Sequence, residues 1–236
     1  MRSPFLSLII VVKMIIEMRR YAMKVLVVGA SGRVGEELVK NLVADGRQVI
    51  AGTRHTDQDF GEGVEVKNID LLADEATLVG ELRPLELDAI YFVAGSRGKN
   101  LLQIDAFGAV KLETAADKLG IKRFIMLSSW HSTSPAEWQD ESMMNYNIAK
   151  FFGDHWLMDH TDLNYTILQP VGLVEEPATG KVDLNPKNAG TGKNTITDVA
   201  KVLSEMLKCE NTFHRVISMR QGETDIKLAL DTLKSI

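Results

Sequence analysis

The chain has 236 residues, of which 45% are hydrophobic and 25% charged, and its 27 Lys and Arg against 32 Asp and Glu give a formal charge of −5. This composition is typical of one globular domain, and its acidity without a basic run argues against nucleic acid or an anionic membrane surface as the main ligand. Cys209 is the single cysteine, so no disulfide framework is predicted, and a small molecule or another protein remains as the ligand.

The first 22 residues differ in character from the rest of the chain. Apolar runs cover Phe5 to Val12 and Met14 to Ile16, and basic residues follow them. The runs are too short to span a bilayer, which needs about 20 apolar residues, and the order of basic and apolar residues is not that of a secretory signal. We interpret residues 1–22 as a leader or a non-native extension; the alternative is a docking or membrane-surface segment. The patterned domain then covers residues 23–236.

From Met23 onward, short β-branched runs alternate with longer helical patterns, which is typical of repeated βαβ units around a parallel sheet. Most of these runs are almost continuously apolar, as expected for strands covered on both faces. The predicted strands are Lys24 to Val28, Gln48 to Gly52, Val64 to Asn68, Asp88 to Val93, Arg123 to Leu127 and Tyr165 to Leu168. The predicted helices are one that ends at Gly46 and others at Glu75 to Leu82, Leu101 to Leu119 and Met143 to Met158.

The first strand leads directly into a glycine-rich turn and then into a helix. The turn is Gly29-Ala30-Ser31-Gly32-Arg33-Val34-Gly35, a G-x-x-G-x-x-G pattern in the strand, turn and helix setting of a dinucleotide site. Gly29 can make the tight turn, Gly32 lets the backbone approach a pyrophosphate, and Gly35 lets the helix pack closely on the strand. Open N–H groups at the helix N-terminus favour phosphates. The pattern predicts a Rossmann-type fold; the alternative is a turn that binds nothing.

The end of the second strand bears on which nicotinamide cofactor binds. An acidic residue at this place would bond the ribose 2′-hydroxyl of NAD, but the sequence here is Thr53-Arg54-His55. A guanidinium pairs well with a 2′-phosphate, and Arg33 in the turn can add a second positive contact. We therefore predict NADP in preference to NAD, although each arginine alone would be typical of a solvated surface. Asp70, just past the third strand, is placed to approach the adenine.

Tyr146 and Lys150 stand four residues apart in a predicted helix, so their side chains share one face. An ammonium beside a phenol favours the phenolate, which lets Tyr146 exchange a proton with a substrate hydroxyl or carbonyl. Ser129 follows the fifth strand, at the edge where open α/β sheets bind ligands, and its hydroxyl can hold the same oxygen. Trp130 and His131 come next and either line the substrate pocket or pack within the loop. Alone, the Tyr-x-x-x-Lys spacing is a weak signal.

The chain changes character after the sixth strand. The stretch Val171 to Asn194 has no clear period and is predicted as loop. A helix capped by Thr197, a strand at Arg215 to Met219 and a closing helix from Thr224 follow it. The predicted fold is therefore α/β, a doubly wound parallel sheet with a small C-terminal substrate cap from about residue 171.

No metal site is predicted. His155 and His160 are five residues apart and lack the H-E-x-x-H pattern, so they are more typical of a polar surface than of zinc ligands. Ser128 and Ser129 lack the G-x-S-x-G elbow of hydrolases, so this alternative is less well supported.

Together these motifs resemble the short-chain dehydrogenase/reductase superfamily, in particular its atypical members related to NAD(P)-dependent epimerase/dehydratases. The likeness covers essentially all of residues 23–236 and rests on the glycine turn, Ala94-Gly95, Ser128-Ser129, Tyr146-x-x-x-Lys150 and Gln169-Pro170. The resemblance implies that Ser129 orients the substrate, that Tyr146 is the acid/base, and that Lys150 assists Tyr146 and holds the nicotinamide ribose. It also implies that the backbone of Pro170 to Leu173 lies against the nicotinamide.

The predicted cofactor site combines the turn, the strand ends and these implied contacts. Its residues are Gly29, Ser31, Gly32, Arg33, Val34, Gly35, Arg54, Asp70, Leu71, Ala94, Gly95, Lys150, Pro170, Val171, Gly172 and Leu173. The predicted catalytic residues are Ser129, Tyr146, Lys150 and Asp105.

Two features depart from the family pattern. Asp105 stands where the family has an active-site Asn, and a carboxylate cannot donate the amide hydrogen bond unless it is protonated. A proton relay through this position is therefore in doubt, and the alternative is an ordinary helix Asp. The segment after Pro170 is also shorter than the C-terminal domain of extended members, which favours a smaller substrate or none.

The motifs predict an NADP-dependent oxidoreductase acting on a small carbonyl or hydroxyl substrate, with NAD as the alternative cofactor. Two other functions stay open: an NAD(P)-dependent sugar epimerase or dehydratase, and an NADP-sensing regulatory protein that turns nothing over. We expect a cytoplasmic protein with no nucleic-acid partner and no transmembrane segment. It is expected to be a monomer or a homodimer, with the Leu101 to Leu119 helix and the Tyr146 helix as a candidate dimer seam.

Overall fold

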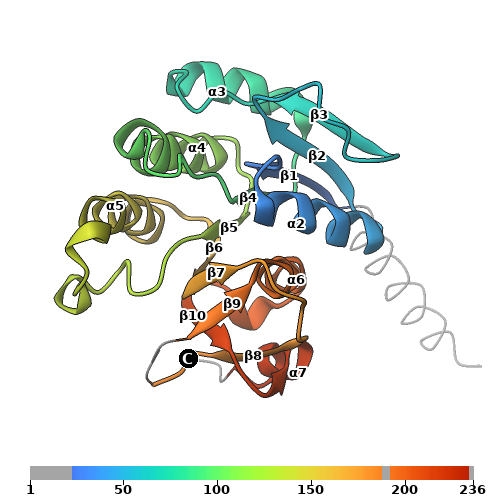
Figure 1. Ribbon diagram of the computed structural model, residues 1–236. Coiled ribbons are helices and arrows are strands. Elements are labelled where there is room, and N and C mark those ends of the chain that lie inside the picture. The colour runs from blue at the N-terminus through green and yellow to red at the C-terminus, as the bar shows by residue number, and fades with distance from the viewer. Residues whose placement is uncertain (1–22, 188–191, 234–236) are drawn as a thin grey trace, which may run out of the picture.

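A nine-stranded sheet runs through the middle of the protein, in the order β11-β8-β10-β6-β5-β4-β1-β2-β3 (Figure 1). The structure is a computed structural model that describes residues 23–187 and 192–233. The predicted leader, residues 1–22, lies outside the described residues. Within the described ranges, no helix combines the length and apolar character that a membrane crossing requires.

The first six strands are parallel, as predicted. The strand order reverses at β1 and β4, which makes this pair the switch point of a doubly wound sheet. The side chains of β1, β4 and β5 are almost all buried, because their apolar runs are covered by helices on both faces. The six strands are β1 (Lys24–Val28), β2 (Gln48–Thr53), β3 (Val64–Asn68), β4 (Ala89–Phe92), β5 (Arg123–Leu127) and β6 (Asn164–Pro170).

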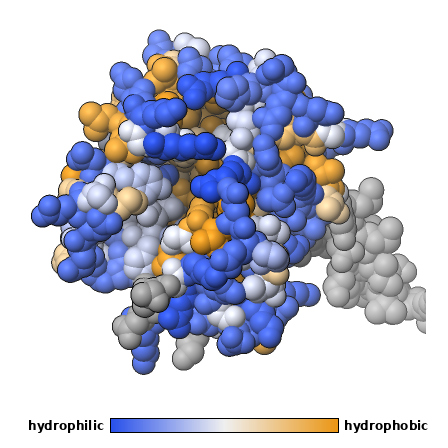
Figure 2. Space-filling model, viewed as in Figure 1, coloured by the Kyte–Doolittle hydropathy of each residue, from blue (hydrophilic) through white to orange (hydrophobic). Residues whose placement is uncertain are grey.

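Helices cover both faces of the sheet and close one hydrophobic core on each. Leu38 belongs to the core under α2 and α6, and Leu112 belongs to the core under α3, α4 and α5. The outer surface in Figure 2 is mostly hydrophilic, with apolar side chains visible near the middle of the view and also at its right and upper left. This two-sided cover gives the predicted Rossmann-type fold. The helices are α2 (Arg33–Ala44), α3 (Glu75–Leu82), α4 (Phe107–Lys118), α5 (Met144–His160) and α6 (Ile196–Met206).

Two helix starts differ from the prediction. The cap of α6 is Thr195, whose Oγ1 accepts the Asp198 N–H at 3.0 Å, and the predicted cap at Thr197 was wrong. The predicted helix from Leu101 opens with a π-helical turn, η2 (Leu101–Ala106), before α4 begins. Such wide turns are frequent at functional sites, and this one carries Asp105.

The segment after β6 is more ordered than its sequence predicts. The stretch predicted as loop contains β7 (Gly172–Val174), β8 (Lys181–Leu184) and the start of β9 (Lys193–Thr195). β7 and β9 form a small parallel sheet, whereas β8 pairs with β10 (Arg215–Gln221) and β11 (Thr224–Asp225) at the edge of the central sheet. The loop prediction was wrong because strands of three or four residues are too short to show a period of two.

Short helices complete the fold. α7 (Ile226–Asp231) begins after the predicted start at Thr224, because the Asp225 side chain accepts the Lys227 N–H and caps it. Single 3₁₀ turns are η1 (Arg83–Leu85), η3 (Pro135–Glu137), η4 (Glu141–Met143) and η5 (Glu210–Thr212).

Candidate active site

A cavity of about 1040 Å³ lies at the carboxyl ends of the central strands, over the switch between β1 and β4. This is the place where open α/β sheets bind ligands. Every residue of the predicted catalytic and cofactor sets lines this cavity except Gly35. The fold therefore brings together residues from six strand ends that are far apart in the sequence.

The glycine turn forms a cradle at the start of α2. Gly29 has a φ of 93°, and a Cβ there would lie 2.6 Å from the backbone of Ala94, so only glycine fits. A Cβ at Gly35 would collide with the carbonyl oxygen of Gly29, so this position also requires glycine, although Gly35 does not line the cavity. The N-cap is Gly32, which has no side chain to bond the first turn of α2, so the N–H groups there stay open to an anion. The cradle fits a pyrophosphate.

Hydroxyl and cationic groups gather where β2 ends. The Thr53 hydroxyl donates to Ser31 Oγ at 2.9 Å and accepts the His55 N–H at 3.0 Å. The exposed Arg54 lines the cavity next to them, as the sequence places it. This end of the cavity therefore offers hydrogen-bond donors and positive charge.

Two predicted cofactor residues already have partners. Arg33 forms an ion pair with Glu175 at 3.0 Å, and both side chains are more than half exposed. Exposed ion pairs contribute little, so Arg33 remains available to a phosphate. Asp70 Oδ1 accepts the Leu72 N–H at 2.9 Å, which fixes the turn after β3 against the cavity.

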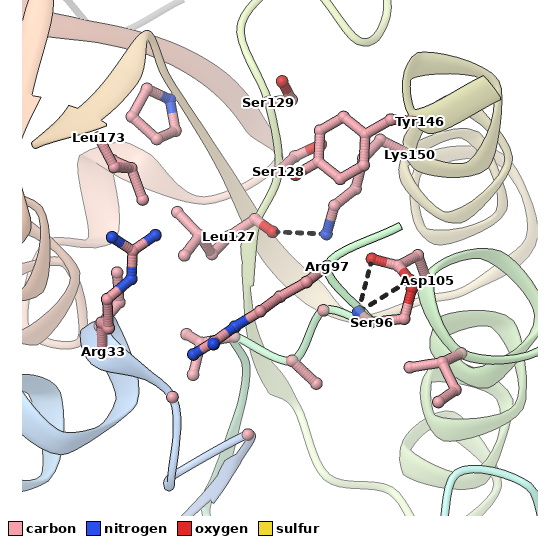
Figure 3. A pocket seen from close by; sticks show the side chains of 18 of the residues that line it. Arg33, Ser96, Arg97, Asp105, Leu127, Ser128, Ser129, Tyr146, Lys150 and Leu173 are labelled. Carbon is pink, nitrogen blue, oxygen red and sulfur yellow. Dashed lines mark hydrogen bonds between the residues drawn. The ribbon is translucent and has the colours of Figure 1, made fainter. Parts of the chain in front are cut away.

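Tyr146 and Lys150 project from α5 into the cavity, one helical turn apart (Figure 3). Lys150 is 4% exposed, and its Nζ donates to the Leu127 carbonyl at 3.2 Å. The same Nζ lies 5.9 Å from the centre of the Tyr146 ring and 5.8 Å from the centre of the Phe92 ring. A buried ammonium tied to the end of β5 beside a phenol is the arrangement that acid/base chemistry at Tyr146 needs.

The two serines after β5 have different surroundings. Ser128 is buried, and its Oγ donates to Asp154 Oδ2 at 2.6 Å. Ser129 is partly exposed, and Figure 3 shows it on the same side of the cavity as Tyr146. In the part of the chain that the structure describes, the Ser129 hydroxyl has no hydrogen-bond partner. Of the two serines, Ser129 is the one free to meet a ligand.

Asp105 anchors the loop after β4. It is 1% exposed, and its two carboxylate oxygens accept the Ser96 N–H at 3.3 and 3.0 Å (Figure 3). A Cβ at Gly95 would lie 3.3 Å from Asp105 Oδ1, so the loop passes very close to the carboxylate. An acceptor fits this place, because the carboxylate receives the Ser96 N–H and holds the loop after β4.

Three aromatic residues, Trp130, His131 and Trp138, lie in the segment between β5 and α5. Trp130 stacks on His131 with ring centres 4.4 Å apart, and the His131 ring contacts the Glu137 carboxylate. Trp138 Nε1 donates to the His131 carbonyl at 2.8 Å, which holds the left-handed turn at His131. Trp130 and His131 therefore pack against each other within the loop and also line the cavity.

Sequence reasoning missed several polar residues at this site, among them two basic residues and one acidic residue. Arg97 and Lys99 line the cavity after β4, and Figure 3 shows Arg97 extending toward the side where Arg33 lies. Asp154 is fully buried behind the site. Its position four residues after Lys150 was the available signal, because that spacing puts both side chains on one face of α5.

Comparison with known proteins agrees with the fold and with the glycine cradle. Residues 29–210 match the family described as NAD(P)H-binding. The chain belongs to this family. Membership supports a nicotinamide dinucleotide as the cofactor, and the matched residues begin at Gly29 of the glycine cradle. The predicted kinship with atypical short-chain dehydrogenase/reductases related to epimerase/dehydratases is confirmed.

Two relatives and one solved structure match this chain along almost their whole length. A protein named uncharacterized sugar epimerase YhfK, from Bacillus subtilis, is 34% identical over 225 residues, which cover 89% of this chain and 100% of that protein. The UPF0659 protein YMR090W of Saccharomyces cerevisiae is 32% identical over 228 residues, covering 89% and 99%. The crystal structure of the oxidoreductase ylbE from Lactococcus lactis has a TM-score of 0.85 at 40% identity, covering 89% and 96%.

Proposed function

We propose that this protein is an NADP-dependent oxidoreductase acting on a small carbonyl or hydroxyl substrate. The observation that carries the proposal is the Tyr146 and Lys150 pair, beside Ser129, in the cavity that the glycine cradle opens. The nicotinamide cofactor supplies or accepts the hydride when it is bound. The cradle would hold its pyrophosphate, and the backbone of Pro170 to Leu173 would face its nicotinamide end.

The chain's own residues then handle the proton. In the direction of reduction, the Tyr146 hydroxyl donates its proton to the substrate oxygen, and the Lys150 ammonium stabilises the phenolate that remains. The Ser129 hydroxyl donates a hydrogen bond to the same oxygen and orients it. Asp105 holds the loop after β4 and takes no part in the proton transfer.

The test is NADPH oxidation in the presence of aldehydes, ketones and quinones, followed by absorbance. Tyr146→Phe keeps the ring and loses the hydroxyl, so we expect turnover to fall by about 10²-fold or more while NADPH binding is retained. Tyr165→Phe is the matched control, because Tyr165 lies on β6 and does not line the cavity. Full activity of Tyr146→Phe would overturn the proposal.

The preference for NADP rests on the groups at the end of β2. Ser31, Thr53 and Arg54 line the cavity there, and Arg33 adds a second guanidinium from the turn. A 2′-phosphate would accept charge-assisted hydrogen bonds from these groups. Calorimetry should give a dissociation constant for NADP at least about 10-fold below that for NAD. Equal constants would refute the preference.

A sugar epimerase or dehydratase is the second candidate. It is favoured by the name of the Bacillus subtilis relative, which is 34% identical to this chain. The same Tyr146 and Lys150 would serve, but the cofactor would return to its starting state within each turnover. Oxidised cofactor that accumulates in step with product supports the oxidoreductase, whereas turnover of sugar nucleotides with a catalytic amount of cofactor supports the epimerase.

We further propose that residues 23–236 form a single domain, because β8 and β10 extend the same sheet that carries the cofactor cradle. A chain that begins at Met23 should therefore bind NADP as tightly as the full chain. A loss of binding in the shorter chain would contradict this.

A further inference from the structure

Two carboxyl groups are buried between α4 and α5, behind the candidate active site. Glu113 and Asp154 are both 0% exposed. The helices touch at Ala109 and Gly153, where a Cβ on Gly153 would lie 3.3 Å from the Ala109 Cβ. Glu113 stands one turn after Ala109 on the same face of α4, and Asp154 directly follows Gly153. Both carboxyl groups therefore lie inside the helix contact.

The hydrogen bonds of the two carboxyl groups are very unequal. Asp154 Oδ2 accepts hydrogen bonds from Ser128 Oγ at 2.6 Å, from Ser132 Oγ at 2.5 Å and, at 3.5 Å, from Gln169 Nε2. Asp154 Oδ1 and both oxygens of Glu113 have no donor among the residues that the structure describes. A buried charge without donors is costly, so the present contacts favour a charge on Asp154 and none on Glu113.

Charge balance leads to the same assignment. Among the residues that the structure describes, Lys150 is the cation that acts on both carboxyl groups, and it can compensate only one negative charge. Burial raises the pKa of Glu113 well above its usual value, and the negative charge of Asp154 raises it further. Burial also raises the pKa of Asp154, but the hydrogen bonds from Ser128 and Ser132 and the charge of Lys150 oppose that rise. Two carboxyl groups buried this deeply near each other cannot both be ionised, so the pair is expected to retain one proton.

We propose that Glu113 holds a proton in the folded protein and donates it to the free oxygen of Asp154, so that the two residues form a singly charged positioning pair behind Lys150. The hydrogen bond gives a partner to Asp154 Oδ1, which otherwise has none. Asp154 in turn holds Ser128 and Ser132, the two ends of the segment that carries Ser129. Neither carboxyl group lines the cavity, so the pair acts through Ser129 and Lys150 and does not touch a ligand.

The groups that act on the pair come from α5, from the segment after β5 and from β6. The charged groups acting on Glu113 from α5 are Asp154 and Lys150. The groups facing Asp154 are the uncharged Ser128 and Ser132 from the segment after β5 and Gln169 from β6. A change in the protonation of Glu113 therefore alters the electrostatic interactions of Asp154 and Lys150.

Infrared spectroscopy tests the proton directly. The carbonyl stretch of a protonated carboxyl group is separate from the bands of carboxylates, so the protein at neutral pH should show this band and Glu113→Gln should lack it. Glu62→Gln, at an exposed position, is the matched control and should keep the band. If Glu113→Gln does not fold, the unaltered protein still decides the question, because absence of the band at neutral pH overturns the proposal. A band that survives in folded Glu113→Gln also overturns it.

Turnover tests the positioning task, and this arm alone rests on the proposed roles of Ser129 and Lys150. Asp154→Asn removes the charge that accepts the Ser128 and Ser132 hydrogen bonds, so turnover with NADPH should fall by about 10-fold while the KM for NADPH stays within about 2-fold. Glu113→Gln exchanges one neutral group for another and should keep turnover within about 2-fold of the unaltered protein. Equal losses in both variants, or none in Asp154→Asn, overturn the assignment, whereas a purely structural pair would change stability alone.

Discussion

Ser128 and Ser129 are identical neighbours at the end of β5, and the extended backbone sends their side chains to opposite sides. The Ser128 hydroxyl bonds a fully buried carboxylate, and the Ser129 hydroxyl stands in the cavity near Tyr146. The same chemical group is therefore placed for stability at one position and for substrate contact at the next.

Substitution of each serine should separate these two effects. Ser128→Ala removes a donor from the buried Asp154, so the free energy of unfolding in urea should fall by about 1–3 kcal/mol. Ser129→Ala should change stability by less than about 0.5 kcal/mol. It should nevertheless lower NADPH-dependent turnover by about 10-fold to 100-fold, since it removes a hydrogen bond to the developing charge. The reverse pattern, with Ser129→Ala the less stable variant, would contradict the assignment.

Arg54 offers a second test at the scale of one residue. Arg54→Ala removes a guanidinium from the end of β2, so the dissociation constant for NADP should rise by about 10-fold to 100-fold. The constant for NAD should stay within about 2-fold, because NAD has no 2′-phosphate to lose a contact. Calorimetry measures both. Arg83→Ala, an exposed arginine away from the cavity, is the control, and an equal loss for both cofactors would refute the phosphate contact.

The elements that the sequence predicts well are those whose own residues determine them. β1, β4 and β5 have apolar runs because both faces are covered, and the glycine turn follows β1 because Gly29 needs a positive φ beside Ala94. β7 and β9 escape prediction because three residues show no period, and their pairing depends on contacts across the fold. Short strands of this kind are determined by contacts with distant segments, which the local sequence does not show.

Helices α4 and α5 show the same limit for charged residues. From the sequence, Glu113 and Asp154 would be expected on the solvated faces of their helices, because carboxyl groups are seldom buried without a partner. Only the contact between the two helices shows that both point inward. The cavity-lining residues, by contrast, follow from motifs at strand ends, where the fold class itself dictates the position.

The cap of α6 provides a test at the scale of one element. Thr195 and Thr197 are two residues apart, and only the Thr195 hydroxyl accepts the Asp198 N–H, at 3.0 Å. Thr195→Ala should lower the free energy of unfolding by about 1 kcal/mol, because it leaves a helix N–H without its acceptor. Thr197→Ala should change it by less than about 0.5 kcal/mol. Equal losses in urea unfolding would mean that the cap is not specific to Thr195.

At the scale of the whole molecule, one sheet connects the cofactor cradle at β1 with the last strands of the chain. β10 pairs with β6, and β8 and β11 continue the sheet beyond it. α6 and α2 share one hydrophobic core, so the C-terminal segment also supports the helix that begins at the glycine turn. Unfolding should therefore be cooperative, and the buried carboxyl groups should affect the stability of the entire molecule.

The pH dependence of stability tests this coupling. Burial raises the pKa of Glu113 in the folded protein, so the folded state binds a proton that the unfolded state, with a Glu pKa of about 4.3, releases. The stabilising contribution is complete below about pH 4.3 and is lost as the pH rises toward the folded pKa. Glu113→Gln should remove up to about 1.4 kcal/mol per pH unit from the fall in unfolding free energy between about pH 5 and pH 7. Glu62→Gln controls for loss of a charge, and an unchanged slope in Glu113→Gln would mean that folding takes up no proton there.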